Sequence, residues 1–220
     1  MALEYGAEGI GLCRTEHMFF EPSRLALVRE TILGAYFSQR QPDDAEVMAR
    51  YHSALDKLEE LQADDFEQIL LRMDGKPVVI RLLDPPMHEF LPGHIELEAE
   101  LAEARSVGDA SAIARMEEVH AAVADTRESN PMLGLRGCRL GLSYPDIYRM
   151  QVRAIMDASQ KATAVGIDVQ IEIMVPLVSH ANEMGKLREI LEQSIDQSQR
   201  GLRRGSSTRS ARWSKCREPR

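Results

Sequence analysis

Three arginines occupy matching places in the sequence, each at the end of a short apolar run or directly after it. They are Arg14 after Gly9–Cys13, Arg81 after Val78–Ile80 and Arg136 after Leu133–Leu135. A planar guanidinium binds carboxylate or phosphate through two parallel hydrogen bonds, so several together suit a small polyanion. The alternative is that each arginine pairs with a local acid, because a charge is costly to bury alone. Candidate acids are Glu16, Asp84 and Glu172.

The apolar runs before these arginines are typical of buried parallel strands. A charged residue that directly follows such a run lies at the carboxyl end of the strand. In an α/β barrel, that end of the strands carries the active face. We therefore expect Arg14, Arg81 and Arg136 to converge on one anion-binding pocket.

Amphipathic helical patterns separate the apolar runs along the chain. The predicted strands are Gly9–Arg14, Val78–Asp84, Leu133–Arg139 and Val169–Pro176. The predicted helices are Glu21–Ala35, a long helix from the cap at Pro42–Asp44 to Leu61, Phe66–Met73 behind a cap at Asp64–Asp65, Glu96–Arg105, Ala110–Thr126, Pro145–Val165 and Ser179–Gln193.

This alternation of strands and helices predicts a parallel sheet in an α/β fold. Four such units predict the N-terminal half of a (β/α)8 TIM-type barrel, with long helical insertions. An open doubly wound sheet is the alternative, and it is less favoured because no Gly-x-Gly-x-x-Gly motif opens a helix. The first strand begins so near residue 1 that we expect a preceding segment in the intact protein.

Composition excludes several classes of protein. The chain has 220 residues, 44% hydrophobic and 28% charged, and its net charge of −8 argues against nucleic acid as a partner. No run approaches the roughly 18 apolar residues of a membrane span. The three cysteines are far apart and fit a reducing compartment, and His88 and His94 have no standard metal-ligand spacing.

The charge changes abruptly near residue 200. From Arg200 onward, eight basic residues face the single acid Glu218, a net charge of +7, whereas residues 1–199 carry −15. We therefore predict a partial barrel domain over 1–199 and a basic tail over 200–220 that is disordered or frame-shifted. A shifted reading of permitted codons across 209–219 gives Val-Gly-Ala-Met-Val-Glu-Val-Pro-Arg-Ala. The alternative is a genuine basic tail that binds a partner.

Four segments together resemble the C-terminal phosphoenolpyruvate/pyruvate-binding barrel of the pyruvate, phosphate dikinase family. They are Gly9–Phe20, Arg81–Pro92, Asn130–Leu140 and Ile171–Val178. Phosphoenolpyruvate synthase and Enzyme I of the sugar phosphotransferase system share the barrel, but His-Met-Phe-Phe and Leu-Asp-Pro-Pro-x-His-Glu-Phe look specific to the dikinase.

The resemblance implies phosphoryl transfer between pyruvate and phosphoenolpyruvate, coupled in the intact enzyme to ATP, AMP, pyrophosphate and phosphate. It implies that Arg14 and Arg81 hold the phosphate and that Arg136 is the third arginine of the substrate site. It also implies Mg²⁺, a homodimer, and a cytoplasmic location, or an organellar one if the source is eukaryotic.

The family's two magnesium ligands and its acid cysteine have no match in this sequence, and Glu172 belongs to a different strand of the pattern. We therefore assign no metal ligand and no catalytic residue, and we expect the chain alone to be inactive. The alternative function is that of a truncated, non-catalytic barrel fragment that binds anions weakly or pairs with an intact subunit.

Overall fold

The chain forms an α/β fold around one parallel sheet. The computed structural model describes residues 3–85, 90–126, 134–203 and 212–213. Four strands pair side by side in chain order, every neighbouring pair parallel. They are β1 (Ile10–Arg14), β2 (Pro77–Arg81), β3 (Gln170–Met174) and the two-residue β4 (Arg212–Trp213). The predicted α/β class and parallel sheet are confirmed.

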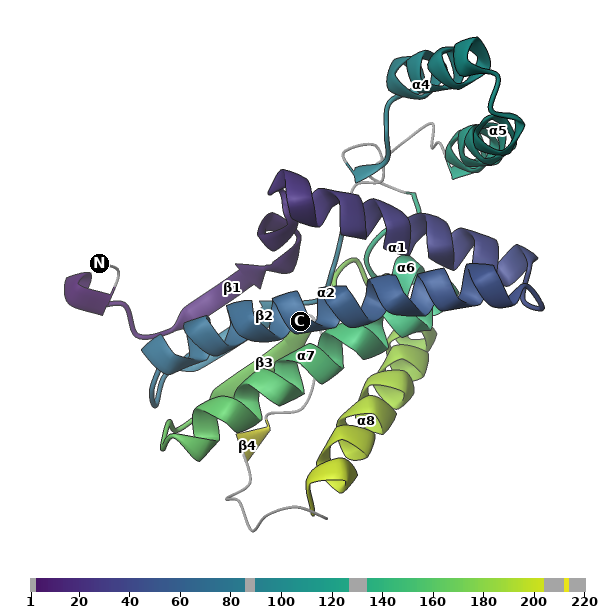
Figure 1. Ribbon diagram of the computed structural model, residues 1–220. Helices are drawn as coiled ribbons and strands as arrows, with labels where there is room; N and C mark the ends of the chain where they lie inside the picture. The colour runs from purple at the N-terminus through teal and green to yellow at the C-terminus, as the bar shows by residue number, and fades with distance from the viewer. Residues whose placement is uncertain (1–2, 86–89, 127–133, 204–211, 214–220) are drawn as a thin grey trace.

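Helices connect the strands. They are α1 (Pro22–Arg40), α2 (Ala45–Arg72), α4 (His94–Val107), α5 (Ala110–Thr126), α6 (Cys138–Ser143), α7 (Pro145–Ala164) and α8 (Ala181–Arg203), with 3₁₀ helices η1 (Leu3–Tyr5) and η2 (Thr15–Phe19). In Figure 1, α2 and α7 lie in front of the sheet and α8 lies beside α7, whereas α4 and α5 project away from the sheet.

The core lies between the sheet and these helices. Alternate residues of β2 and β3 are buried, among them Val78, Ile80 and Ile171, at most 2% exposed. They share a cluster with apolar side chains of α2 and α7, such as Leu70 and Ile155. One face of the sheet therefore packs against the helices. Polar residues lie at the carboxyl ends of the strands.

Helix α2 is continuous, so the predicted break at Asp64–Asp65 is wrong. Asp44 caps the helix as predicted, since its side chain accepts hydrogen bonds from the backbone N–H groups of residues 46 and 47. The apolar face then runs through Ala63 and Phe66, which are 4% and 0% exposed. Burial of this face carries the helix past two aspartates that would otherwise suit a cap.

The predicted third strand, Leu133–Arg139, is also wrong over its described residues 134–139. They form a bend and a turn that lead into α6, and β2 pairs directly with β3. Gly137 has φ +55°, and the N–H of Cys138 donates to the carbonyl of Pro176 at 2.9 Å. A left-handed glycine and this loop bond are incompatible with an extended ladder.

Helices α4 and α5 form a hairpin that returns to α1 through polar contacts. The hydroxyl of Tyr36 donates to Asp125 at 2.7 Å, and Arg40 donates to the same carboxylate at 3.1 Å.

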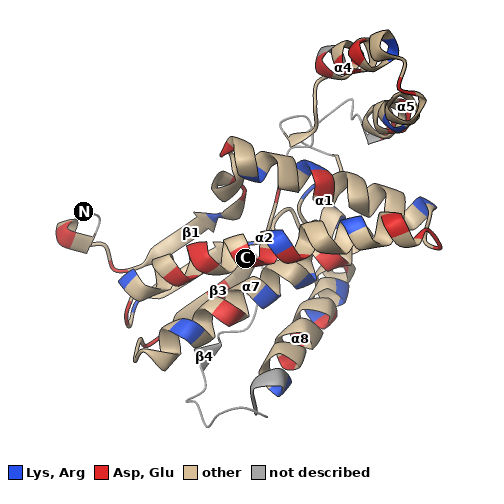
Figure 2. Cartoon of the chain, viewed as in Figure 1, with Lys and Arg blue, Asp and Glu red and all other residues tan. Residues whose placement is uncertain are grey.

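Acidic and basic residues are interspersed along α2 and α7 on the face seen in Figure 2. Within the described ranges, no helix has the length and apolarity to cross a membrane.

The predicted boundary at residue 200 falls inside α8, which ends at Arg203. Most of the predicted tail lies outside the described residues, so its disorder or shifted frame stays a prediction. The described pair Arg212–Trp213 joins the sheet beside Gln170 and Ile171 of β3.

Candidate anion-binding site

Two of the three arginines end neighbouring strands. Arg14 is the last residue of β1, Arg81 is the last residue of β2, and the two are register partners across the parallel pair. Their side chains therefore leave the same face at the same carboxyl edge. Arg136 reaches the site from the turn before α6 rather than from a strand.

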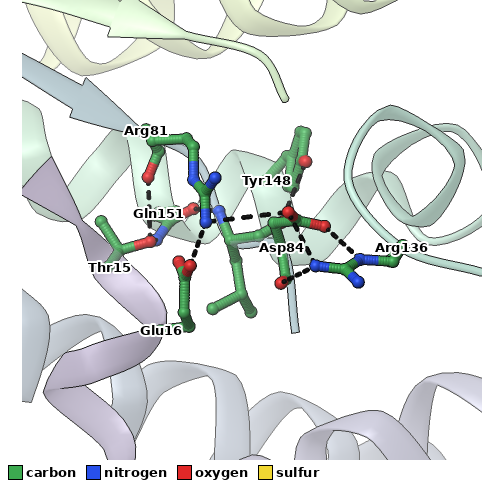
Figure 3. Close-up of polar contacts among 8 residues, drawn as sticks. Thr15, Glu16, Arg81, Asp84, Arg136, Tyr148 and Gln151 are labelled. Carbon is green, nitrogen blue, oxygen red and sulfur yellow. Dashed lines mark hydrogen bonds and ion pairs between the residues drawn. The ribbon is translucent and has the colours of Figure 1, made fainter. Parts of the chain in front are cut away.

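Two buried acids hold Arg81 and Arg136 together. Asp84, 2% exposed, accepts from Nε of Arg136 at 2.8 Å and from Nη2 at 3.1 Å. The same carboxylate lies 3.7 Å from Nη2 of Arg81, which also donates to Glu16. Figure 3 shows Asp84 between the two arginines and Glu16 beside Arg81. Arg81 and Arg136 thus pair with local acids, as the alternative interpretation of the sequence predicted. The acids are Glu16 and Asp84.

Arg14 differs from the other two arginines. It is exposed, and its guanidinium makes no hydrogen bond or ion pair with any residue of the described ranges. Arg14 therefore offers a guanidinium that can bind an anion without first breaking an internal pair.

Two buried polar atoms at the site have no hydrogen-bond partner among the described residues. They are Oε2 of Glu16 and Nε of Arg81. Buried polar atoms are normally paired, and leaving one unpaired costs about 1–3 kcal/mol. One donor and one acceptor therefore remain unsatisfied beside the ion pair, where a bound ligand can pair with them.

A buried hydrogen-bonded chain lies behind the arginines. The amide of Gln151 donates to the hydroxyl of Thr15 at 2.9 Å and accepts from the N–H of Leu83 at 2.8 Å. The hydroxyl of Tyr148 donates to the carbonyl of Leu83 at 3.0 Å. Burial raises the pKa of Tyr148 well above its usual value, and the nearby carboxylate of Asp84 adds to the rise.

Sequence reasoning missed Thr15, Tyr148 and Gln151. Gln151 left one signal, because a glutamine on the apolar face of an amphipathic helix needs a buried partner. It is 1% exposed on α7, between Tyr148 and Ile155 of the same buried face. The sequence does not show which strands that partner belongs to.

The two carboxylates beside the arginines, Glu16 and Asp84, do not fit a magnesium ion. The described residues contain no group of three or more His, Cys, Asp or Glu side chains placed to hold a metal. Mg²⁺ needs a near-octahedral set of oxygen ligands, whereas Glu16 and Asp84 are both paired with arginines. We therefore derive no step through a metal from this part of the chain.

The cysteines of the described ranges are not activated thiols. Burial raises the pKa of Cys13, and the carboxylates of Glu16 and Asp65 raise it further. Burial also raises the pKa of Cys138, whose thiol donates to the carbonyl of Leu177 at 3.0 Å. Because the thiolate is the reactive form, neither cysteine has the character of a nucleophile.

Comparison with known proteins identifies the family to which this chain belongs. The family described as PEP-utilising enzyme, PEP-binding domain, matches residues 1–208. Since the match covers most of the chain, the protein belongs to this family.

Its relatives include pyruvate, phosphate dikinases from distant organisms. The chain is 47% identical over 195 residues to pyruvate, phosphate dikinase 1, chloroplastic, of Oryza sativa subsp. japonica, which covers 87% of the chain and 19% of the relative. It is 47% identical over 184 residues to the Giardia intestinalis enzyme, covering 84% and 19%. It is 40% identical over 197 residues to the Clostridium symbiosum enzyme, covering 89% and 20%. The resemblance predicted from the sequence is confirmed, and the chain spans about a fifth of the length of these relatives.

Proposed function

We propose that this chain supplies the phosphoenolpyruvate/pyruvate site of a pyruvate, phosphate dikinase. In the intact enzyme, a phosphoryl group would pass between pyruvate and phosphoenolpyruvate, coupled to ATP, AMP, pyrophosphate and phosphate. Membership of the PEP-binding family and the identity to dikinases support this assignment. The expectation that the chain alone is inactive is part of the proposal.

The observation that carries the proposal is the register of Arg14 with Arg81 at the carboxyl edge of β1 and β2. Arg136 is tied to the same edge through Asp84. In this proposal, Arg14 and Arg81 bind the phosphate of the ligand, and Arg136 completes the positive rim. Phosphoryl transfer depends mainly on positioning and on neutralisation of charge, which guanidinium groups provide.

We also propose that residues 1–199 form half of a (β/α)8 barrel. Parallel sheets normally have both faces covered. Here the strands bury one set of alternate residues against helices, while Leu12 and Met174 of the other set are 41% and 38% exposed. Further barrel strands would cover that face and close the edges of the sheet.

Other properties of the intact enzyme belong to the proposal. Magnesium would be held by residues other than Glu16 and Asp84, because both carboxylates are paired with arginines. Homodimer formation and a cytoplasmic or organellar location come from the resemblance. The rice relative is named chloroplastic and the Rhizobium meliloti relative carries no such word, so the compartment stays a prediction.

The test is equilibrium dialysis of the 220-residue chain with radiolabelled phosphoenolpyruvate. Arg14→Gln removes a guanidinium that pairs with no described residue, so it leaves the stability unchanged. A hydrogen bond to a charged group is worth about 1.5–3 kcal/mol, so we expect affinity to fall about tenfold or more.

The matched control is Arg72→Gln, at the end of α2, where the exposed arginine donates to the carbonyl of Gln68. It lies before the amino end of β2, away from the proposed site. Equal affinities of the Arg14 and Arg72 variants, or no saturable binding by the unmodified chain, would overturn the proposal.

A further inference from the structure

The side-chain amide of Gln151 links the two strand ends that carry arginines. It reaches from α7 to the hydroxyl of Thr15, next to Arg14, and to the N–H of Leu83, next to Asp84. The two contacts lie 136 and 68 residues away in sequence, and all the groups are buried. One side chain thus joins the end of β1 to the segment after β2.

The chain of bonds continues to Arg81 itself. The hydroxyl of Thr15 accepts from Gln151 and donates to the carbonyl of Arg81 at 3.0 Å. Tyr148, one turn before Gln151 on α7, donates to the carbonyl of Leu83. Figure 3 shows Thr15 and Gln151 beside the Arg81–Glu16 pair and Tyr148 near Asp84. The backbone of the Arg81–Leu83 stretch is therefore held by α7, directly at Leu83 and through Thr15 at Arg81.

We propose that Gln151 is a positioning residue for the arginine site, acting through Thr15 and Leu83. The role rests on the proposed function, since it sets the spacing of Arg14, Arg81 and Asp84 for the bound anion. A bidentate contact to phosphate needs a fixed separation of the guanidinium groups. A buried network in which every hydrogen bond is made holds the backbone next to the guanidinium groups in one position.

Glutamine suits this role because the side chain must donate a hydrogen bond to Thr15 and accept one from Leu83. The amide N–H₂ meets the threonine hydroxyl, and the amide oxygen meets a backbone N–H. Methionine has a similar shape but neither group. A second buried glutamine, Gln62 of α2, is 0% exposed, and within the described part of the chain neither its amide nitrogen nor its amide oxygen has a hydrogen-bond partner. It provides a control with the same substitution and the same burial.

The experiment compares Gln151→Met with Gln62→Met in the 220-residue chain. The first readout is the exchange rate of the Arg81 Nε–H in the ligand-free protein, measured by NMR. That proton is buried, so we expect Gln151→Met to raise its exchange at least tenfold and Gln62→Met to leave it within twofold. The second readout is the affinity for phosphoenolpyruvate, expected to fall about tenfold in the first variant only.

A second pair keeps the test decisive if Gln151→Met does not fold. Thr15→Ser keeps the hydroxyl and should leave both readouts as in the unmodified chain, whereas Thr15→Val removes it and should show the loss expected for Gln151→Met. Unchanged exchange and unchanged affinity in Gln151→Met, or in Thr15→Val, would overturn the positioning role. Faster exchange together with no binding by the unmodified chain would support the positioning role and reject the proposed function instead.

Discussion

Asp84→Asn tests whether the buried carboxylate holds the arginine site together. The substitution keeps the volume of the side chain and one acceptor oxygen but removes the charge. Asp84 is 2% exposed and accepts two hydrogen bonds from Arg136, at 2.8 and 3.1 Å. It also lies 3.7 Å from Arg81.

The contacts set the expected magnitude. A hydrogen bond to a charged group contributes about 1.5–3 kcal/mol, and one between neutral groups about 0.5–1.5 kcal/mol. Breaking a buried ion pair costs about 3–5 kcal/mol. The side chains of Arg136 and Arg81 are 13% and 18% exposed, so water replaces part of the loss. We therefore expect the free energy of unfolding to fall by about 3 kcal/mol.

Urea unfolding followed by circular dichroism measures this change. With a slope of about 2 kcal/mol per molar urea, the midpoint should fall by about 1.5 M. The matched control is Asp146→Asn, since Asp146 pairs with Arg149 at 2.9 Å on the surface of α7, with side chains 46% and 37% exposed. A surface pair contributes about 0–1 kcal/mol. If the two variants differ by less than about 1 kcal/mol, the carboxylate does not hold the site as we describe.

Two further substitutions test the loop behind Arg136 and the start of α8. Gly137→Ala should destabilise the fold by about 1–3 kcal/mol, because Gly137 has φ +55° and an added Cβ would lie 2.9 Å from the carbonyl oxygen of Pro176. The control Gly185→Ala, which meets no atom within 4 Å in α8, should be neutral or stabilising in the same thermal melts. Glu183→Ala should cost about 1 kcal/mol at pH 7, because its carboxylate accepts from the N–H groups of Ser179 and His180 at 2.8 and 3.0 Å. These bonds lower the pKa of Glu183, so its contribution is present above the usual carboxyl range and lost as the pH falls through the lowered pKa. A difference from the unmodified chain that persists undiminished at pH 2–3 would contradict this assignment.

The sequence predicted correctly those strands and helices in which apolar residues recur at the spacing of the buried face. The apolar run around Val78 and Ile80 predicted a strand of the sheet, and the amphipathic pattern of α7 predicted a helix that packs on it. The third strand failed because Gly134-Leu135-Arg136-Gly137 is apolar enough for a strand, while its conformation is decided by a left-handed glycine and a bond to Pro176. Such long-range bonds leave no local signal in sequence.

The site was predictable in part for a similar reason. Arginines at the ends of apolar runs indicated the edge where they lie, and Arg14 and Arg81 are in register there. The hydrogen bond from Gln151 to Thr15 joins residues 136 apart in the sequence, so only the tertiary structure shows it. The aspartate pair at 64–65 also misled, because Asp is favoured at helix N-caps, whereas α2 continues through both aspartates and buries Phe66 just beyond them.

The most direct test of the arginine site is an NMR titration of the arginine Nε–H signals with phosphoenolpyruvate. We expect the signals of Arg14 and Arg81 to shift along one saturable curve, while that of Arg72 stays in place. A similar, unsaturated drift of all arginine signals, matched by sodium chloride of equal ionic strength, would show only screening of charge. That result, or the absence of any shift at Arg14, would contradict the claim that the carboxyl edge of β1 and β2 binds the anion.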